Sequence, residues 1–492
     1  MFVRNRCDVH AYGHLQSQRS TAAVRGAFWA AINGFAPAAV GAVVFVISSR
    51  FLIPAEFGLV ALAASIAVVG TAIAPAGFGD ALVQRQHLEP RHIDAVFLLC
   101  TVTSLLIYLV IVLTARPISR LMGEEQLELL LPVVGARVIF DLLAVVPNAL
   151  LSRVMSFHLL ALRTFVASVV AAAVCLTLLA MGFGLWALAL SQLASSIAAC
   201  VGSLLSVRWR PRFKLDRDAL GELTRYGTYA SGTRLLNLLN LDQILVGGLL
   251  GATSLGIFGF AKRIFSFVIQ VMSGPLYSVS LTLLSSLQDD KEKLREAFQI
   301  ASFYAAACSF PCFIGLAAVA GDLVPLIFGQ QWSDAIPALQ LFCTIGVMGS
   351  VGILHRPLIT SMGHANLWMY YQVSDKLLAL LIIFVTHRHG VAAMVGWLAV
   401  GRMIVLPIPI AMTLRLLQMD LLTYLKIFLA PTLAGLMMLA GIELMRYWLD
   451  LDIGYLRAFL EIAAGTLAYT AFLLILEHKR MAYLVKHVAV TG

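Results

Sequence analysis

Seven basic side chains lie inside long apolar segments or near their ends, where a charged group is costly to place. They are Arg137, Arg234, Lys262, Arg263, Arg356, Lys376 and Arg402. An unpaired charge in hydrocarbon costs roughly 2.5 kcal/mol or more, so such residues are seldom kept without a use. Guanidinium and ammonium groups in a site of low dielectric constant bind phosphate and carboxylate strongly. These residues therefore indicate the binding of an anion within the apolar region.

Acidic residues in the same segments are fewer, and they are Asp141, Asp242 and Asp375. Arg137 and Asp141 are four residues apart on one expected helix, and the simplest interpretation is that they pair with each other. Lys262 and Arg263 follow the start of a segment, and both side chains are able to reach the interface. Because seven cations face three anions, pairing does not neutralise every cation, and an interior cavity of positive potential is expected.

The elements that must position these side chains are membrane-spanning helices. Hydrophobic residues make up 60% of the 492 residues and charged residues only 12%, which is too little polar surface for an exterior in water. Apolar segments of about 20 residues, long enough to cross ~30 Å of hydrocarbon, follow one another from Ala27 to Leu476. Hydropathy places about fourteen of them. The predicted fold is an all-α polytopic membrane protein.

Lys and Arg gather on one side of this predicted topology. If the N-terminus is cytoplasmic, the basic N-terminal arm, the basic loop 208–217 and the tail around Lys479 all face the cytoplasm. This bias accounts for the net charge of +9. The sequence contains no zinc-finger spacing and no basic recognition strand, so nucleic-acid binding is not expected.

A short internal repeat suggests two halves. Residues 52–60 (LIPAEFGLV) resemble residues 250–258 (LGATSLGIF), and in both a Leu and a Gly are six residues apart. Six segments precede the basic loop, so two six-helix units share one orientation, as in several transporters. The expected organisation is a cytoplasmic arm 1–26, an N-lobe 27–206, a basic cytoplasmic linker 207–226, a C-lobe 227–414, two further helices in 415–478 and a cytoplasmic tail 479–492.

The seven cysteines are an odd number and lie mostly in apolar segments, which does not indicate a disulfide framework. Cys308 and Cys312 are one helical turn apart, but no third ligand stands at a suitable spacing. No metal and no cofactor are predicted.

Three motifs carry a family resemblance: residues 50–59 (RFLIPAEFGL), 77–85 (GFGDALVQR) and 240–258 (NLDQILVGGLLGATSLGIF). They resemble the Wzx-type polysaccharide flippases, most closely the branch of colanic acid and other exopolysaccharide exporters. That group is similar to the MATE and lipid II flippase families of the MOP superfamily. The first 20 or so residues exceed the usual family start and are either an arm or a misassigned beginning.

The resemblance implies a transporter, not an enzyme. Its expected cargo is an undecaprenyl-diphosphate-linked oligosaccharide, moved from the cytoplasmic to the periplasmic leaflet of the bacterial inner membrane by alternating access of two lobes. A polysaccharide polymerase and a chain-length regulator are possible partners, besides membrane lipid. Coupling to a proton or sodium gradient is plausible by analogy only.

With such a cargo, the candidate ligands of the diphosphate or of an anionic sugar are Arg234 first, then Arg356 and Arg402. Arg234 lies in the most polar segment, near Asn237, Asn240 and Asp242, and three of these four residues can share one helix face. Asp242 is the candidate partner of Arg234 or the site of a coupling ion. Trp368 fits an interface belt, whereas Tyr370 and Tyr371 stack on sugar if they face the cavity.

Three other functions compete. A polysaccharide polymerase is expected to have a long periplasmic loop, which this sequence lacks. A MATE-like drug antiporter needs an acidic chamber for cationic drugs, whereas the excess here is basic. A lipid II flippase shares the fourteen-helix plan and a cationic cavity, and only the motif at 77–85 favours the exopolysaccharide branch over it.

Overall fold

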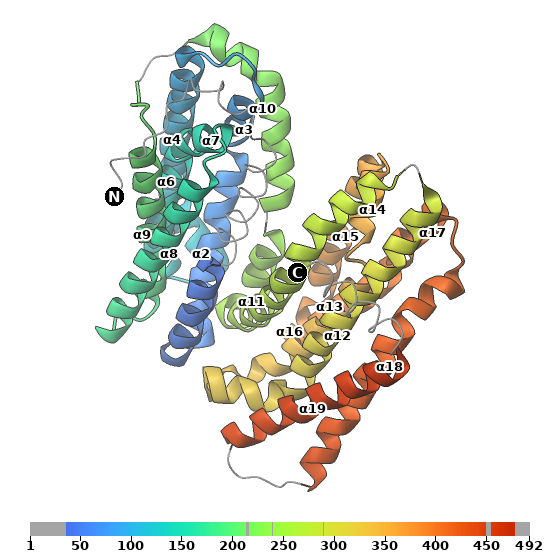
Figure 1. Ribbon diagram of the computed structural model, residues 1–492. Helices are drawn as coiled ribbons and strands as arrows, with labels where there is room; N and C mark the ends of the chain where they lie inside the picture. Colours follow the sequence, from blue (N-terminus) through green and yellow to red (C-terminus); the bar gives the residue numbers. More distant parts are fainter. Residues whose placement is uncertain (1–35, 213–215, 239, 289, 449–453, 478–492) are drawn as a thin grey trace. The chain divides into compact units, whose positions relative to one another are not determined.

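The computed structural model describes residues 36–212, 216–238, 240–288, 290–448 and 454–477 (Figure 1). Within these ranges the chain is helical apart from short connections, and it contains no β-strand. It forms two compact units, the first ending at Gly256 and the second beginning at Ile257. The all-α prediction is confirmed, whereas the predicted lobe boundaries stay a prediction.

The first unit is a bundle whose long helices are joined by short turns. After a helix over Ala36–Phe51, its elements are α2 (Pro54–Ile73), α3 (Gly77–Gln84), α4 (Pro90–Met122), α5 (Leu127–Gly135), α6 (Arg137–Leu143), α7 (Val145–Arg153), α8 (Phe157–Ala180), α9 (Leu185–Ser206) and α10 (Arg217–Leu238). Helix α10 packs against α2, α3 and α4. Helix α11 (Leu241–Ser286) crosses the division between the units and bends at Gly251, whose φ of 83° is a conformation that favours glycine.

The second unit contains the remaining helices. They are α12 (Lys291–Phe328), η2 (Gln330–Ala335), α13 (Ile336–Val351), α14 (His355–Ser361), α15 (Ala365–Thr386), η3 (His387–His389), α16 (Gly390–Val405), α17 (Pro407–Leu417), α18 (Leu421–Trp448) and α19 (Gly454–Leu476). Helices α18 and α19 pack on each other and on α12. Helices α18 and α19 therefore belong to the core of this unit.

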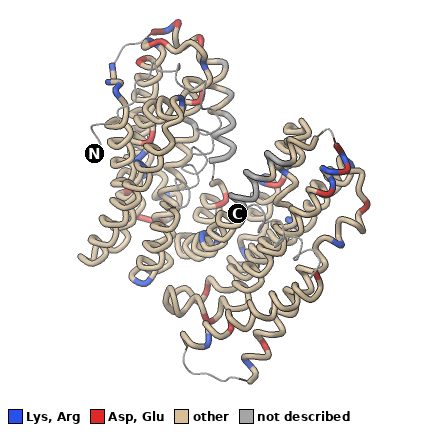
Figure 2. Tube along the Cα trace, viewed as in Figure 1, with Lys and Arg blue, Asp and Glu red and all other residues tan. Residues whose placement is uncertain are grey.

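The described residues contain 11 stretches long and apolar enough to cross a membrane, and Figure 2 shows long tan segments between few charged residues. One stretch, Ala365–Leu417, includes α15, α16 and α17. Leu105, Leu109 and Leu113 recur every fourth residue on α4, and each is more than half exposed. An exposed leucine stripe on an apolar helix of this length indicates contact with lipid. The chain is a multi-pass membrane protein, and the count of fourteen spans stays a prediction.

The two copies of the internal repeat touch each other inside the first unit. A Cβ atom added to Gly58 would lie 1.7 Å from the carbonyl oxygen of Ala252, and one added to Gly256 would lie 1.8 Å from that of Pro54. Pro54 and Ala252 hold the same position in the two copies, as do Gly58 and Gly256. The contact is therefore reciprocal, and only glycine allows the two backbones to approach so closely.

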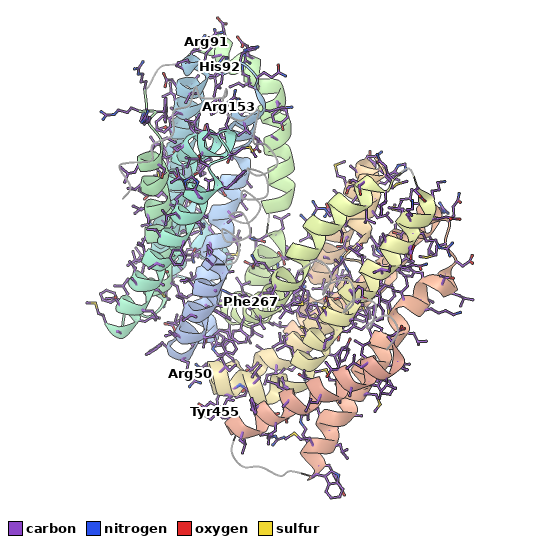
Figure 3. All side chains as sticks on the ribbon, in the orientation of Figure 1. Arg50, Arg91, His92, Arg153, Phe267 and Tyr455 are labelled. Atoms are coloured by element: carbon purple, nitrogen blue, oxygen red, sulfur yellow. The ribbon has the colours of Figure 1, made fainter. Side chains whose placement is uncertain are left out.

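Helix α3 ends inside the first unit, and an arginine from another helix satisfies its last carbonyl groups. The guanidinium of Arg153, at the end of α7, donates to the carbonyl oxygens of Leu82 at 2.7 Å, Gln86 at 3.0 Å, and also Val83 and Arg85 (Figure 3). Arg153 is 8% exposed. Carbonyl groups at a helix end have no partners within the helix, so this side chain replaces the water that a surface helix end would bind.

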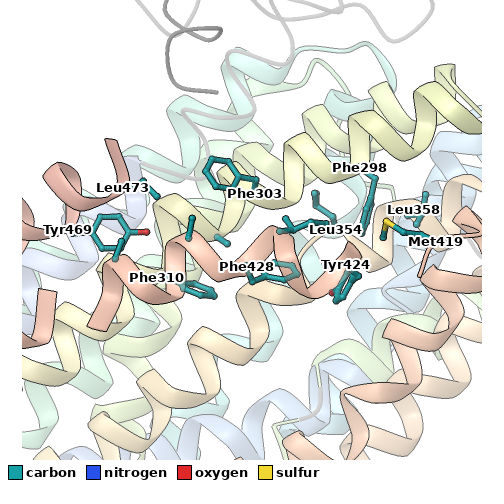
Figure 4. Packing of buried hydrophobic residues seen from close by; sticks show 14 of the residues in the cluster. Phe298, Phe303, Phe310, Leu354, Leu358, Met419, Tyr424, Phe428, Tyr469 and Leu473 are labelled. Atoms are coloured by element: carbon teal, nitrogen blue, oxygen red, sulfur yellow. The ribbon is translucent and has the colours of Figure 1, made fainter. Parts of the chain in front are cut away.

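Aromatic residues form the core of the second unit (Figure 4). Phe298 and Phe310 of α12 pack in one cluster with Tyr424 and Phe428 of α18. The hydroxyl of Tyr469 on α19 donates to the carbonyl oxygen of Ala307 on α12 at 3.0 Å. The buried phenol thereby has its hydrogen-bond partner, as such groups need in an apolar core.

An ion cluster joins the same three helices. Arg446 of α18 donates to Glu461 of α19 at 2.8 Å and to Asp322 of α12 at 3.1 Å. Arg457 also donates to Glu461, at 3.3 Å, and Arg446 bonds Glu443 at 2.8 Å. Glu461 is fully buried. Because a buried carboxylate is stable only when its charge is compensated, these arginines are required for the packing of α19.

Candidate functional site

A cavity of about 250 Å³ lies within the second unit, lined by residues of α13, α14, α15, α16 and α17 and of the breaks between them. Arg356 and Arg402, two of the three first-ranked candidates from the sequence, both line it. Its other polar lining residues are His355, Trp368, Tyr371 and Gln372. The structure thus brings together two predicted cations that are 46 residues apart in the sequence.

Helix breaks explain why two arginines meet here. Helix α13 ends at Val351 and α14 begins at His355, which places Arg356 in the first turn after the break. Helix α16 ends at Val405, just before Pro407, and Arg402 lies in its last turn. Proline interrupts the helical hydrogen-bond ladder, and broken helices in membrane proteins are stable where they line a polar cavity. The two breaks therefore both position cations and form the wall of the cavity.

Arg402 is partly neutralised by an acidic residue. Its Nη1 atom lies 2.5 Å from Oδ2 of Asp375 on α15, and the two side chains are 31% and 27% exposed. The Nε atom of Arg402 is buried and has no hydrogen-bond partner among the described residues. Arg402 is therefore held in place by Asp375, and its Nε atom is a buried donor that none of the described residues satisfies.

His355 is fully buried beside the cavity. Its Nε2 atom lies 2.9 Å from the hydroxyl of Tyr424, which in turn is 3.3 Å from the carbonyl oxygen of Val351. Within the described part of the chain, its Nδ1 atom has no partner. A buried polar atom without a hydrogen bond costs about 1–3 kcal/mol.

Trp368 and Tyr371 of α15 form an aromatic wall of the cavity. Their ring centroids are 5.0 Å apart and the rings are inclined at 43°. Tyr371 is buried, whereas Tyr370 is 62% exposed. The indole Nε1–H of Trp368 is buried and bonds to none of the described residues. Trp368 lines the cavity, and its predicted place in an interface belt stays a prediction.

Three residues that line the cavity each have one buried atom without a hydrogen-bond partner among the described residues: Nε of Arg402, Nε1 of Trp368 and Nδ1 of His355. The first two are obligate donors. Such orphans are rare in folded proteins and often mark a missing ligand or water. The cavity can thus bind a group that has several acceptor oxygens and a negative charge.

The other predicted residues lie elsewhere. Arg137 donates to Asp141 at 3.3 Å and to the side-chain oxygen of Gln192 at 3.0 Å, so the two charges pair in the first unit. Lys262 lies 5.7 Å from the ring centroid of Phe258, a cation–π distance. Lys376 and Arg263 are exposed.

Arg234, the first-ranked candidate, belongs to α10, but its side chain lies outside the described residues. Asp242 lies in the first turn of α11, and the next residue, Gln243, accepts a hydrogen bond from Ser65 at 2.7 Å. The roles predicted for Arg234 and Asp242 stay predictions.

Two polar clusters of the first unit were not predicted from the sequence. One is Arg163, which donates to the side-chain oxygen of Asn148 and, at 3.1 Å, to the hydroxyl of Ser203. The other centres on Glu222 of α10, which bonds Arg85 and lies 3.2 Å from Nε2 of the fully buried His92. The hydrogen bonds from His92 and then Arg85 hold the pKa of Glu222 below its usual value. The available signal was polar residues near the ends of apolar segments, which hydropathy alone does not pair.

Comparisons with known proteins agree with this architecture. Residues 47–337 match the profile of a family described as "Polysaccharide biosynthesis protein". The chain is 24% identical to the teichuronic acid biosynthesis protein TuaB of Bacillus subtilis over 92% of this chain and 94% of TuaB. It is 27% identical to the succinoglycan biosynthesis transport protein ExoT of Rhizobium meliloti over 60% of both chains. It is 23% identical to the lipopolysaccharide biosynthesis protein WzxC of Escherichia coli, over 67% of this chain and 68% of WzxC.

Solved structures show the same fold. This chain superposes on the lipid II flippase MurJ, in an inward closed conformation, with a TM-score of 0.73 and 13% sequence identity. The match covers 93% of this chain and all of the MurJ chain. An inward-facing multidrug resistance MATE transporter of the MOP superfamily has a TM-score of 0.51, with 17% identity, over 81% of this chain and 94% of that one.

Proposed function

The chain belongs to the polysaccharide biosynthesis protein family, and from this we propose that it is a flippase for undecaprenyl-diphosphate-linked oligosaccharide repeat units. It is a multi-pass membrane transporter of polysaccharide biosynthesis, with a fold like that of MurJ. In the proposed orientation both termini face the cytoplasm, the membrane is the bacterial inner membrane, and cargo moves toward the periplasm. A polymerase and a chain-length regulator are the proposed downstream partners.

The observation that carries the proposal is the cationic cavity. Two arginines line it, and no carboxylate does among the described residues. An anionic cargo gains charge-assisted hydrogen bonds there, whereas a cationic drug meets repulsion. This favours an anionic lipid-linked substrate over the cargo of a MATE-like antiporter. The charge of the cavity does not distinguish lipid II from other lipid-linked sugars. The relatives named for polysaccharide biosynthesis favour a polysaccharide repeat unit over lipid II.

Reconstitution in liposomes tests the function directly. An undecaprenyl-diphosphate oligosaccharide is placed in the inner leaflet, and its arrival outside is measured by digestion with an external glycosidase. We expect protein-dependent digestion that is faster than in protein-free vesicles. No acceleration over a panel of acidic and neutral repeat units refutes the function, and acceleration of lipid II alone assigns the alternative. An Arg234→Glu protein that inserts normally and still transports at the full rate would remove Arg234 from the mechanism.

A further inference from the structure

A short extended segment, residues 207–212, begins where a membrane span ends. The span is α9, whose 22 residues end at Ser206. They cover about 33 Å at 1.5 Å per residue, close to the thickness of the hydrocarbon layer. The segment reads VRWRPR, and the wider loop 208–217 has five basic residues and one acidic residue. Its arginines are therefore within reach of the lipid headgroups.

Alternate residues of this segment are fixed against the protein. Val207 has an extended backbone, with a φ of −107° and a ψ of 149°, and is 5% exposed. The indole Nε1–H of Trp209 donates to Oδ1 of Asp94 on α4 at 3.1 Å. The ring of Trp209 also packs edge-on against Phe97 of α4, with centroids 5.2 Å apart. Because successive side chains of an extended chain point to opposite sides, the arginines next to Val207 and Trp209 are directed outward.

The arginines of the segment are all exposed: Arg208, Arg210 and Arg212. Within the described ranges, Arg210 and Arg212 form neither a hydrogen bond nor an ion pair, so these two carry the argument. At the start of the next helix, the carboxylate of Asp216 lies 4.0 Å from Arg91 and pairs with that side chain instead. The two guanidinium groups are therefore available to an anion from outside the chain.

Membrane topology alone does not explain this geometry. Basic residues near the end of a span orient a protein through their number and position during insertion, before the chain has folded. That role does not require a fixed conformation, whereas here Trp209 is held by a hydrogen bond to Asp94, which is itself only 5% exposed. A fixed segment with outward arginines indicates a use in the folded protein.

We propose that residues 207–212 form a binding site for the headgroup of an anionic phospholipid such as phosphatidylglycerol. Arg210 and Arg212 bind the phosphate, since the planar guanidinium group matches two phosphate oxygens at once. Trp209, fixed by Asp94, holds the segment at the level of the headgroups, where basic clusters next to a span attract anionic lipid. The site ties the first unit to its surrounding leaflet and does not depend on the cargo.

Native mass spectrometry of the full-length protein in detergent micelles tests the proposal. Dioleoyl-phosphatidylglycerol and dioleoyl-phosphatidylcholine share their acyl chains, so the difference in affinity reports the headgroup. At about fivefold per arginine, we expect a preference of about thirtyfold for phosphatidylglycerol at low salt. Arg210→Gln together with Arg212→Gln should abolish most of it. Equal binding of the two lipids, or a double variant that keeps the preference, overturns the proposal.

A second pair of variants tests the anchor separately from the charge. Asp94→Ala removes the acceptor of Trp209 and also a negative charge. Charge alone predicts tighter binding of phosphatidylglycerol, whereas loss of the anchor predicts binding at least about threefold weaker. Asp94→Asn loses the same charge but keeps an acceptor oxygen, so it should bind at least as tightly as the wild type. Trp209→Phe loses the hydrogen bond without a change of charge and should weaken binding as Asp94→Ala does. Undiminished binding in both Asp94→Ala and Trp209→Phe overturns the anchored site.

The control variants separate this site from general attraction between charges. Lys291→Gln together with Arg388→Gln removes two exposed cations elsewhere and should leave the lipid preference unchanged. A loss as large as that of the double variant at Arg210 and Arg212 overturns the proposal. Displacement of the lipid by excess inorganic phosphate would assign the arginines to free phosphate, and arginine-dependent binding of a short oligonucleotide in place of the lipid would assign them to nucleic acid. Either result also overturns the proposal.

Discussion

Replacing Gly58 by alanine is expected to force apart the two copies of the internal repeat. The new Cβ would lie 1.7 Å from the carbonyl oxygen of Ala252, so the helix must move by more than 1 Å to reach the 3.0 Å below which Cβ contacts essentially never occur. Overpacking of this kind typically costs about 1–3 kcal/mol. The clashing atom belongs to the backbone, so it cannot move away by a change of side-chain rotamer. We therefore expect a cost in the upper part of this range.

Thermal unfolding of the purified protein in detergent measures the loss. With an unfolding entropy of ~2.1 cal/mol/K per residue, a unit of roughly 220 residues loses about 2–6 °C in Tm for this cost. Gly256→Ala should cause a similar loss, because its Cβ would lie 1.8 Å from the carbonyl oxygen of Pro54. Gly259→Ala is the matched control on α11, since no atom lies within 4 Å of its added Cβ.

The double variant tests whether the two glycines act through one contact. Once one substitution has separated the backbones, the second meets less resistance, so the combined loss in Tm should be smaller than the sum of the single losses. A Gly58→Ala protein that melts within 1 °C of the wild type, or strictly additive losses, would refute the reciprocal contact.

Three further outcomes follow from other sites. Arg446→Met should lower the free energy of unfolding by about 3–5 kcal/mol, because it leaves the negative charge of the buried Glu461 undercompensated. Lys293→Met breaks an exposed pair in which the lysine side chain is 70% exposed, so it should cost less than about 1 kcal/mol. Chemical denaturation compares the two variants. The pKa of Glu222 is lowered in the folded state, so its stabilising contribution is present above the unfolded pKa and is lost as the pH falls through the folded pKa. Glu222→Gln should therefore flatten the acid side of the curve of Tm against pH. An unchanged curve contradicts this expectation. Asp375→Ala removes the partner of Arg402, so it should lower the free energy of unfolding by about 1.5–3 kcal/mol, as expected for a lost hydrogen bond to a charged group, and chemical denaturation measures this.

Much of the architecture could be predicted from the sequence, because hydropathy and helix length constrain membrane segments strongly. The repeat at Gly58 and Gly256 was found as a letter pattern, and the structure gives it a physical reason in the contact between the two copies. Arg356 and Arg402 were identified as costly cations within apolar segments, and the structure places both at one cavity.

The remainder of the site depends on helix rotation, which hydropathy does not specify. Trp368 lies near the start of a helix, a position typical of interface belts, yet its indole turns to the cavity. His355 carried no sequence signal, because a single histidine in an apolar segment is compatible with many surroundings. Asp375 was assigned no partner by spacing, since Arg402 lies on another helix 27 residues away. Tertiary pairing of this kind requires knowledge of which helix faces meet.

The position of Arg153 determines when, during synthesis of the chain, the end of α3 receives its hydrogen bonds. The carbonyl groups that it satisfies at the end of α3 precede it by 67 to 71 residues. While the chain emerges, this helix end is synthesised before its hydrogen-bond donor. Carbonyl groups at a helix end have no partner within the helix, so these groups depend on water until α7 arrives. Folding of this half is thus a joint event, in which a later helix completes an earlier one.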